Sequence, residues 1–202
     1  MNSTLDKIDH RYYLNGNLIP SVTQIIKLLT EDKFKYVDKK LLQDKADFGT
    51  EVHKEIENYD TGNYNWILTR TDVDILVQKY VEFCSDYNCK PKYNELSLYH
   101  SKLIYAGTID KICTIDGKEV ILDIKTGRYY KEHYIQLAAY SQLVNNNKLG
   151  RNLDGGLLYL SSEGYKFKML SYKDMKEYFE VFKALLTIYN YINVGGKNGK
   201  EK

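Results

Sequence analysis

Cysteine and proline are scarce in this chain, with three cysteines and two prolines in 202 residues. The cysteines, Cys84, Cys89 and Cys113, lack the short paired spacing of zinc sites, so we interpret Cys84 and Cys89 as buried or incidental residues. No stretch approaches the roughly 18 continuous apolar residues of a membrane helix, and no segment has the pattern of a signal peptide. We therefore expect a cytoplasmic protein with reduced cysteines and no membrane partner.

A strong excess of one charge is also missing. Lysine and arginine total 29 against 27 aspartates and glutamates, for a net charge of +2. An anionic partner such as DNA must then be met by a local basic patch rather than by a field of the whole molecule. The length fits one domain, which we expect over residues 1–194 with a hairpin and helical extension at 1–45. We expect residues 195–202 to form a disordered tail.

Helix and strand signals alternate along the rest of the chain. Asn15-Gly16 predicts a hairpin within residues 10–19, and Ser21 is a helix N-cap followed by an apolar stripe of Val22, Ile25, Ile26 and Leu29. Periodicity predicts helices at 47–59, 72–87, 133–144 and 173–192, and strands at 92–100, 103–115, 118–126, 155–161 and 165–170. This order indicates an α/β or α+β layered domain.

The segment YAGTIDKICTIDGKEVILDIKTG, residues 105–127, concentrates charge on a hairpin. A turn at Asp116-Gly117 pairs Ile115 with Lys118 and, counted outward, sets Asp110 opposite Asp123. A core face is expected to hold Ile109, Cys113, Ile115, Val120, Leu122 and Ile124, with Asp110, Asp123 and Lys125 on the other face. Opposed like charges destabilise a sheet, so we expect a cation between them. A register slipped by one residue would instead make these aspartates edge charges.

Further polar residues are expected near this hairpin. A turn centred on Ser101-Lys102 would set Glu95 opposite Thr108, beside Asp110 and across from Lys125. His53 and Glu57 are four residues apart on one predicted helix and therefore share a face, as do Gln136 and Tyr140 on another, with His133 on the same side. A cage of carboxylates favours Mg²⁺ or Mn²⁺, and a neighbouring lysine can orient or deprotonate the attacking water, or stabilise developing charge.

The motifs resemble those of the PD-(D/E)XK nuclease superfamily, in particular its RecB-like and phage-type exonucleases. Asp110 and Asp123-Ile124-Lys125 match the D…(D/E)-x-K signature. The matching segments are IPSVTQII (19–26), GTEVH (49–53), GTID (107–110), VILDIKTG (120–127) and QLAAY (136–140). IPSVTQII resembles a helix start found in phage exonucleases and in the mitochondrial genome maintenance exonuclease. Five ordered motifs over residues 19–140 are more specific than the signature alone.

The resemblance implies a restriction-endonuclease-like αβββαβ core, with a central mixed sheet flanked by helices. It also implies a Mg²⁺- or Mn²⁺-dependent DNA exonuclease. By position, His53, Asp110, Asp123 and the Ile124 carbonyl would bind metal, and Lys125 would be catalytic. Glu95 would serve a second metal or hold Lys125. Gln136 and Tyr140 would brace the site and contact DNA, and the further DNA-binding or supporting residues would be Ser21, Thr23, Glu57 and Thr126. Three cysteines cannot hold the iron–sulfur cluster of some relatives, so we expect no cluster.

Alternatives remain open from sequence. One is a structure-specific or nicking endonuclease, and another is a non-catalytic nucleic-acid-binding protein that retains the fold. The lysine-rich segment 33–45, which includes Phe34 and Tyr36, is either a grip for single-stranded DNA or a solvated segment. The expected partners are single strands or duplex ends of DNA, with a single-strand annealing or recombination protein as a further candidate. A phage-encoded protein would act in the bacterial cytoplasm. Cleavage polarity and oligomeric state have no sequence signal.

Overall fold

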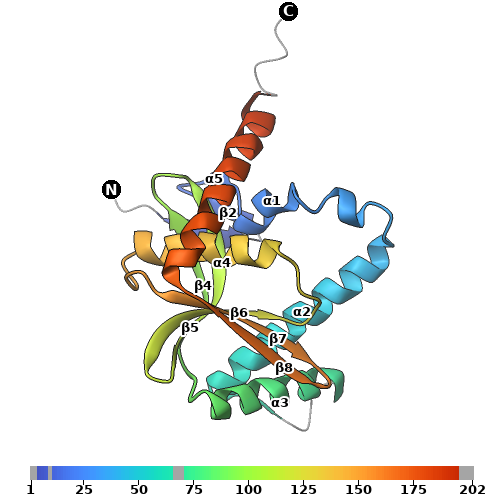
Figure 1. The fold of residues 1–202 in the computed structure, drawn as a ribbon. Helices are drawn as coiled ribbons and strands as arrows, with labels where there is room; N and C mark the ends of the chain where they lie inside the picture. Colours follow the sequence, from blue (N-terminus) through green and yellow to red (C-terminus); the bar gives the residue numbers. More distant parts are fainter. Residues whose placement is uncertain (1–3, 9–10, 66–70, 196–202) are drawn as a thin grey trace, which may run out of the picture.

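The computed structural model describes residues 4–8, 11–65 and 71–195 (Figure 1). The strands are β1 (Leu5–Ile8), β2 (Arg11–Leu14), β3 (Asn17–Ile19), β4 (Lys90–His100), β5 (Tyr105–Ile115), β6 (Lys118–Lys125), β7 (Asp154–Ser161) and β8 (Gly164–Leu170). The helices are α1 (Val22–Lys27), α2 (Lys39–Asp60), α3 (Thr71–Asp86), α4 (Glu132–Asn146) and α5 (Tyr172–Gly195), with a short 3-10 helix at Asp32–Phe34.

A five-stranded mixed sheet in the order β4-β5-β6-β7-β8 forms the centre of the molecule. Neighbouring strands are antiparallel except β6 and β7, which are parallel because α4 carries the chain back between them. Helices α1, α4 and α5 cover one face and α2 and α3 the other (Figure 1). This arrangement confirms the predicted α/β architecture with helices flanking a central mixed sheet. A separate three-stranded sheet contains β1, β2 and β3.

The β5–β6 hairpin has the predicted turn. Asp116 and Gly117 have φ of +48° and +81°, as a two-residue hairpin turn requires, and Ile115 pairs with Lys118. The ladder continues in the predicted register to Lys111 and Leu122 and ends there. Asp110 is therefore not a ladder partner of Asp123. Its carboxylate instead accepts the N–H of Ile124 at 2.7 Å.

The β4–β5 register differs from the prediction. Ser97, not Glu95, lies opposite Thr108, because the connection is a four-residue loop from Ser101 to Ile104 rather than a two-residue turn. Glu95 falls between the paired positions Asn94–Lys111 and Leu96–Ile109, at the level of Asp110.

The backbone at Glu95 is in the left-handed region, with φ of +46°. Along β5 the alternation of faces also breaks at this level. Ile109 packs into the core under α4, whereas Cys113 and Ile115 pack into the core under α2 and α3. The prediction that these three side chains share one face was wrong at Ile109, and the irregularity in the ladder is the reason.

The helices and hairpins otherwise follow the predictions with shifted ends. Ser21 caps α1 and accepts the N–H of Gln24, as predicted, but α1 ends at Lys27, so Leu29 lies outside it and is partly exposed. Helix α2 begins at Lys39 rather than at residue 47, and strand β1 was not predicted. Among the described residues, every helix is too short or too polar to span a bilayer. Residues 196–202 of the predicted tail lie outside the described residues.

Candidate active site

A cavity of about 700 Å³ opens between the two sheets and helices α1, α2 and α4. Its walls include most of the predicted site residues, namely Ser21, Thr23, His53, Glu57, Glu95, Asp110, Lys125, Gln136 and Tyr140. Asp123 lies fully buried behind Lys125. Thr126 lines a neighbouring hollow and faces Gly49 of α2. The fold therefore brings together residues that are more than one hundred positions apart in the chain.

Helix α2 presents His53 to this cavity. Asp38 caps the helix by accepting the N–H of Lys40, and Val52 and Ile56 are buried against α3 and the sheet, so His53 faces the cavity. Its Nε2 lies 3.1 Å from the carbonyl oxygen of Ile124.

The other ring nitrogen of His53 meets two carboxylates. Nδ1 lies 3.4 Å from Oε1 of Glu95 and 3.6 Å from Oδ2 of Asp110. In the described part of the chain, the candidate ligand atoms of these three residues all lie within 4.8 Å of one another. The structure thus places Glu95 in the group that surrounds His53, and it leaves Asp123 outside it.

Charge balance decides the protonation of His53. Burial alone would lower the pKa of its imidazole, but the carboxylates of Asp110 and Glu95 outweigh burial and raise the pKa to about 9. An Nε2–H donated to the Ile124 carbonyl leaves Nδ1 facing the two carboxylates. A positive charge, either a proton or a metal ion, is what this arrangement favours at Nδ1.

Asp123 and Lys125 form a buried ion pair beside this group. Nζ of Lys125 lies 2.9 Å from Oδ1 and 2.7 Å from Oδ2 of Asp123. Burial raises the pKa of Asp123 to about 6, although Lys125 acts against it. Burial would lower the pKa of Lys125, but Asp123 and Asp110 outweigh it and raise that pKa above its ordinary value. Lys125 is therefore an ammonium ion at neutral pH.

Helix α4 supports the lysine through two polar side chains. Lys125 donates to Oε1 of Gln136 at 3.3 Å, and Nε2 of Gln136 donates to the hydroxyl of Tyr140 at 2.9 Å. A Cβ at Gly107 would come within 2.7 Å of the Tyr140 ring. Only glycine in the GTID segment lets α4 approach β5 closely enough for this chain of hydrogen bonds.

The polar residues that line the cavity without having been predicted as site residues include Lys7, Tyr12, Thr50 and Lys54. Thr50 lies one helical turn before His53, so helical spacing was a usable signal for it. Lys7 and Tyr12 both contact the hydroxyl of Thr108, at 2.9 and 2.7 Å. They reach the site only through the pairing of β1 and β2, which no local sequence signal predicted.

The donor set fits a hard divalent cation. Two carboxylates and an imidazole within a few ångströms are ligands that Mg²⁺ or Mn²⁺ accepts. Metal-bound histidines usually donate their second N–H to a carbonyl or carboxylate, as the position of His53 against Ile124 allows. The Ile124 carbonyl, predicted as a ligand, is engaged with His53 and keeps a second lone pair.

Comparisons with known proteins give only weak similarities. No protein-family model and no curated protein matches the chain. The crystal structure of SSO0001 aligns over 82% of this chain and 74% of its own, with 17% identity and a TM-score of 0.40. The crystal structure of LHK-Exo in complex with dAMP aligns over 88% of this chain and 94% of its own, with 8% identity and a TM-score of 0.40. Both scores are low, so these structures do not place the chain in a family.

Proposed function

We propose that this chain is a Mg²⁺- or Mn²⁺-dependent deoxyribonuclease of the PD-(D/E)XK type that degrades DNA from its ends. The observation that carries the proposal is the convergence of His53, Glu95, Asp110 and the Asp123–Lys125 pair at one cavity. The resemblance of the sequence motifs to those of this superfamily is a separate line of support, because it does not depend on distances in the structure. A structural ion-pair cluster would not require an imidazole turned toward two carboxylates.

His53, Glu95 and Asp110 would hold the metal ion, and Asp123 would join them by releasing one oxygen from Lys125. When bound, the ion would activate water and stabilise negative charge on a phosphodiester. Glu95 is held ready for this role by a backbone conformation that costs about 1–3 kcal/mol in a non-glycine residue. Such strain is commonly found at functional sites.

Lys125 would act as a cationic hydrogen-bond donor. Its raised pKa keeps the proton on Nζ, so the side chain can donate to the phosphate oxygen on which negative charge develops. Gln136 and Tyr140 would fix the direction of this donation, since their hydrogen bonds hold Nζ against Asp123. A general-base role would require a neutral amine, which the surrounding carboxylates disfavour.

DNA would be held through its phosphates at the rim of the cavity. Ser21 and Thr23 offer hydroxyls, and Lys7 and Lys54 offer positive charge. Contacts of this kind give affinity without reading sequence. Tyr36, in the lysine-rich segment, is 92% exposed, and a ring so exposed can stack on a base of a single strand.

The walls of the cavity support a requirement for a strand end. The small sheet and α1 bound it on one side and α2 on the other, and the segment from α1 to α2 runs out from the body and back (Figure 1). We expect Mg²⁺ to support degradation of linear DNA to short products, while covalently closed circles survive. The measurement is one gel that compares linear and circular molecules, each single- and double-stranded.

The same gel separates the alternatives. Cleavage of circular single-stranded DNA as fast as linear DNA would replace the exonuclease proposal with an endonuclease. DNA that is bound but never cut, with either Mg²⁺ or Mn²⁺, would indicate a non-catalytic binding protein.

A further inference from the structure

A second groove, of about 740 Å³, lies near the end of β6 that carries Lys125. It lies between the loop that follows β6 and the β7–β8 hairpin. Its principal side chains are Arg128, Tyr129, Tyr134, Tyr159, Lys166 and Lys168. Apart from Gly127, the last residue of the VILDIKTG segment, no sequence motif includes a residue of this groove, and the proposed cleavage chemistry makes no use of it.

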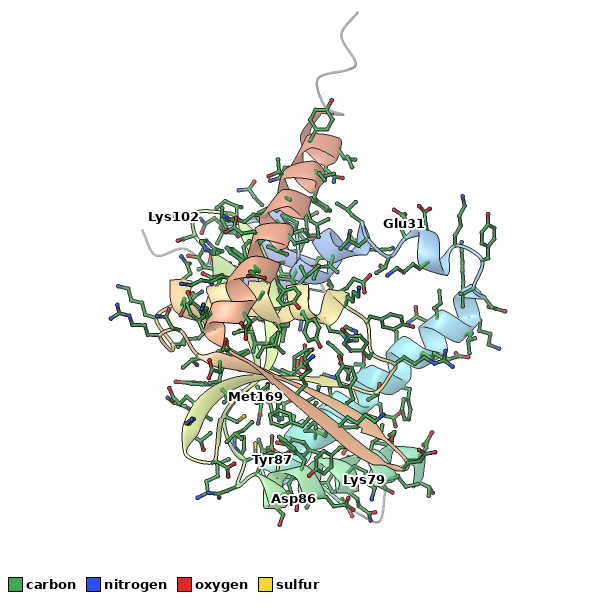
Figure 2. The ribbon with its side chains drawn as sticks, viewed as in Figure 1. Glu31, Lys79, Asp86, Tyr87, Lys102 and Met169 are labelled. Carbon is green, nitrogen blue, oxygen red and sulfur yellow. The ribbon has the colours of Figure 1, made fainter. Side chains whose placement is uncertain are left out.

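The groove exists because α4 leaves part of the sheet uncovered. The helix begins at Glu132, and the β7–β8 hairpin extends beyond that end (Figure 1). The opposite face of the hairpin is packed on α3, where Tyr165 donates to Asp86 and the rings of Phe167 and Tyr87 lie 5.0 Å apart. Figure 2 labels Asp86 and Tyr87 at the end of α3. One face of the hairpin is thus fixed by its packing on α3, and the other face lines the groove.

Aromatic rings form the apolar part of the groove. Tyr134 is 5% exposed and packs on Tyr178, and the hydroxyl of Tyr159 bonds Nδ1 of His133 at 2.9 Å. The ring of Tyr129 packs against both of these rings, with centroid distances of 5.7 Å to Tyr134 and 6.2 Å to Tyr159. It is nevertheless 51% exposed, so much of its surface remains accessible to a ligand.

Positive charge surrounds these rings. Among the described residues that line the groove, three are cationic and one, Glu163, is acidic; the cationic residues are Arg128, Lys166 and Lys168. The chain as a whole has a net charge of only +2, so this excess is local. Nζ of Lys168 lies 4.9 Å from the centroid of the Tyr134 ring, which anchors one cation over the aromatic floor. An anionic ligand with aromatic groups matches both features.

The groove is continuous with the catalytic strand. Tyr159 is the ladder partner of Lys125 on β7, and Gly127, at the edge of the groove, follows Lys125 by two residues. A polymer lying in the groove would therefore run toward the lysine. A small anion would fill neither the length of the groove nor its aromatic wall.

We propose that this groove binds the unpaired strand of the nucleic acid next to the scissile phosphate. One base stacks on Tyr129, and phosphates contact Arg128 and Lys166. Stacking combined with backbone charge contacts is the usual way in which proteins hold single strands without reading sequence. The identity of the ligand rests on the proposed nuclease function, but the binding itself requires no cleavage.

The test is the affinity of the protein for two fluorescent single strands of equal length, an oligo-dT and an abasic deoxyribose-phosphate chain. Anisotropy is measured in EDTA. Stacking of one base contributes about 1–3 kcal/mol, so the wild type should prefer oligo-dT by roughly 5- to 150-fold. Tyr129→Ala should reduce this preference by at least about 5-fold, whatever stacking Tyr36 adds, and Tyr129→Phe, which retains the ring, should keep it.

The charged side of the groove has a separate signature. The double variant Arg128→Ala/Lys166→Ala should weaken binding of both strands equally. It should also flatten the plot of log K against log salt by about 1.4, since each lost phosphate contact to a single strand contributes about 0.7. Circular dichroism of each variant establishes that it is folded.

Three results would overturn the proposal. They are no binding of either strand by the wild type, equal affinity of the wild type for both strands, and an unchanged preference in folded Tyr129→Ala. The nuclease function is judged separately by cleavage in Mg²⁺. A base preference without cleavage would support the binding groove and contradict the nuclease function. Cleavage without a base preference would support the nuclease function and contradict the binding groove.

Discussion

Individual residues at the candidate site carry charges that are stable only together. Lys125 is paired with the buried carboxylate of Asp123, and the imidazole of His53 is turned toward Glu95 and Asp110. Burial acts to lower the pKa of each positive group, but the negative groups around it have the larger effect and raise that pKa above its ordinary value. Removing one member therefore changes the protonation and stability of the others, and single substitutions should have distinct effects.

Lys125→Ala should reduce cleavage by several orders of magnitude while leaving Mn²⁺ binding largely intact, because the lysine is not one of the proposed ligands. Loss of a preorganised charge donor typically costs about 10²–10³ in turnover, and the lysine also positions Asp123. Calorimetric titration of Mn²⁺ and a cleavage assay measure the two effects. Loss of Mn²⁺ binding together with the lysine would show that its assigned role is wrong.

Asp110→Asn and Asp123→Asn should both abolish cleavage but should differ in stability. In Asp110→Asn the new side-chain amide oxygen can still accept the N–H of Ile124, so the metal-free protein should keep its stability. Asp123→Asn leaves the Lys125 ammonium without its buried partner and should cost about 3 kcal/mol, at the lower end for broken buried ion pairs because Lys125 keeps some exposure. Urea unfolding in EDTA measures both. Equal stability of the two variants would contradict the ion-pair geometry.

At the scale of secondary-structure elements, the β4–β5 ladder shifts register between Pro91 and Tyr93 and is interrupted again at the level where the site is formed. Glu95, with φ of +46°, and Asp110 both fall at the interruption of the ladder. Residues at the same level of an antiparallel pair share a face, so the carboxylates of Glu95 and Asp110 both lie near His53. The strained backbone of Glu95 is thus part of the site itself.

Glu95→Gly and Glu95→Ala should separate strain from function. Both remove the carboxylate, so both should weaken Mn²⁺ binding to a similar extent. Glycine adopts a positive φ without a Cβ clash, so Glu95→Gly should be more stable than Glu95→Ala by about 1 kcal/mol. Denaturant midpoints compare the two variants. A more stable alanine variant would mean that the backbone at this position is not strained.

A second element-scale contact ties β5 to the C-terminal end of α2. Lys111 pairs with Asp60, with both side chains at most 3% exposed, and donates to Oδ1 of Asn94 at 2.8 Å. Tyr80 donates to the same aspartate at 3.0 Å. Because α2 also carries His53, this buried pair helps to set the position of the helix.

Lys111→Met should destabilise the protein by about 3–5 kcal/mol, because it leaves the charge of Asp60 buried without a partner. The double variant Lys111→Met/Asp60→Asn should recover most of that loss, since asparagine is neutral and still accepts the hydrogen bond from Tyr80. Thermal unfolding of the single and double variants measures the difference. A double variant no more stable than Lys111→Met would contradict the charge explanation.

Sequence predicted these elements where a local signal exists. Asp116-Gly117 determined the β5–β6 register because a two-residue turn admits one pairing. The loop from Ser101 to Ile104 has no such signal, so the position of Glu95 opposite Thr108 was wrongly predicted. The five motifs led to most of the residues that line the cavity, but Lys7 and Tyr12 depend on long-range packing of the small sheet, which no local pattern encodes.

At the scale of the whole molecule, helices pack on both faces of the mixed sheet, and the level of Glu95 and Asp110 lies at the cavity. The small sheet and α1 lie on one side of that point, and α2 brings His53 from the other (Figure 1). The open groove beside Lys125 extends the charged surface along the β7–β8 hairpin. Together these surfaces suit a nucleic-acid strand that enters by its end.

The most direct test is the degradation of an end-labelled linear oligonucleotide by wild type and Asp110→Asn, each in Mg²⁺, Mn²⁺, Ca²⁺ and EDTA. We expect the wild type to shorten the strand in Mg²⁺ or Mn²⁺ only, because Ca²⁺ accepts longer and looser coordination and activates water poorly. Asp110→Asn should leave the strand intact in every buffer. Shortening in EDTA, shortening by Asp110→Asn at the wild-type rate, or an intact strand with wild type in both Mg²⁺ and Mn²⁺ would contradict a metal-dependent nuclease site.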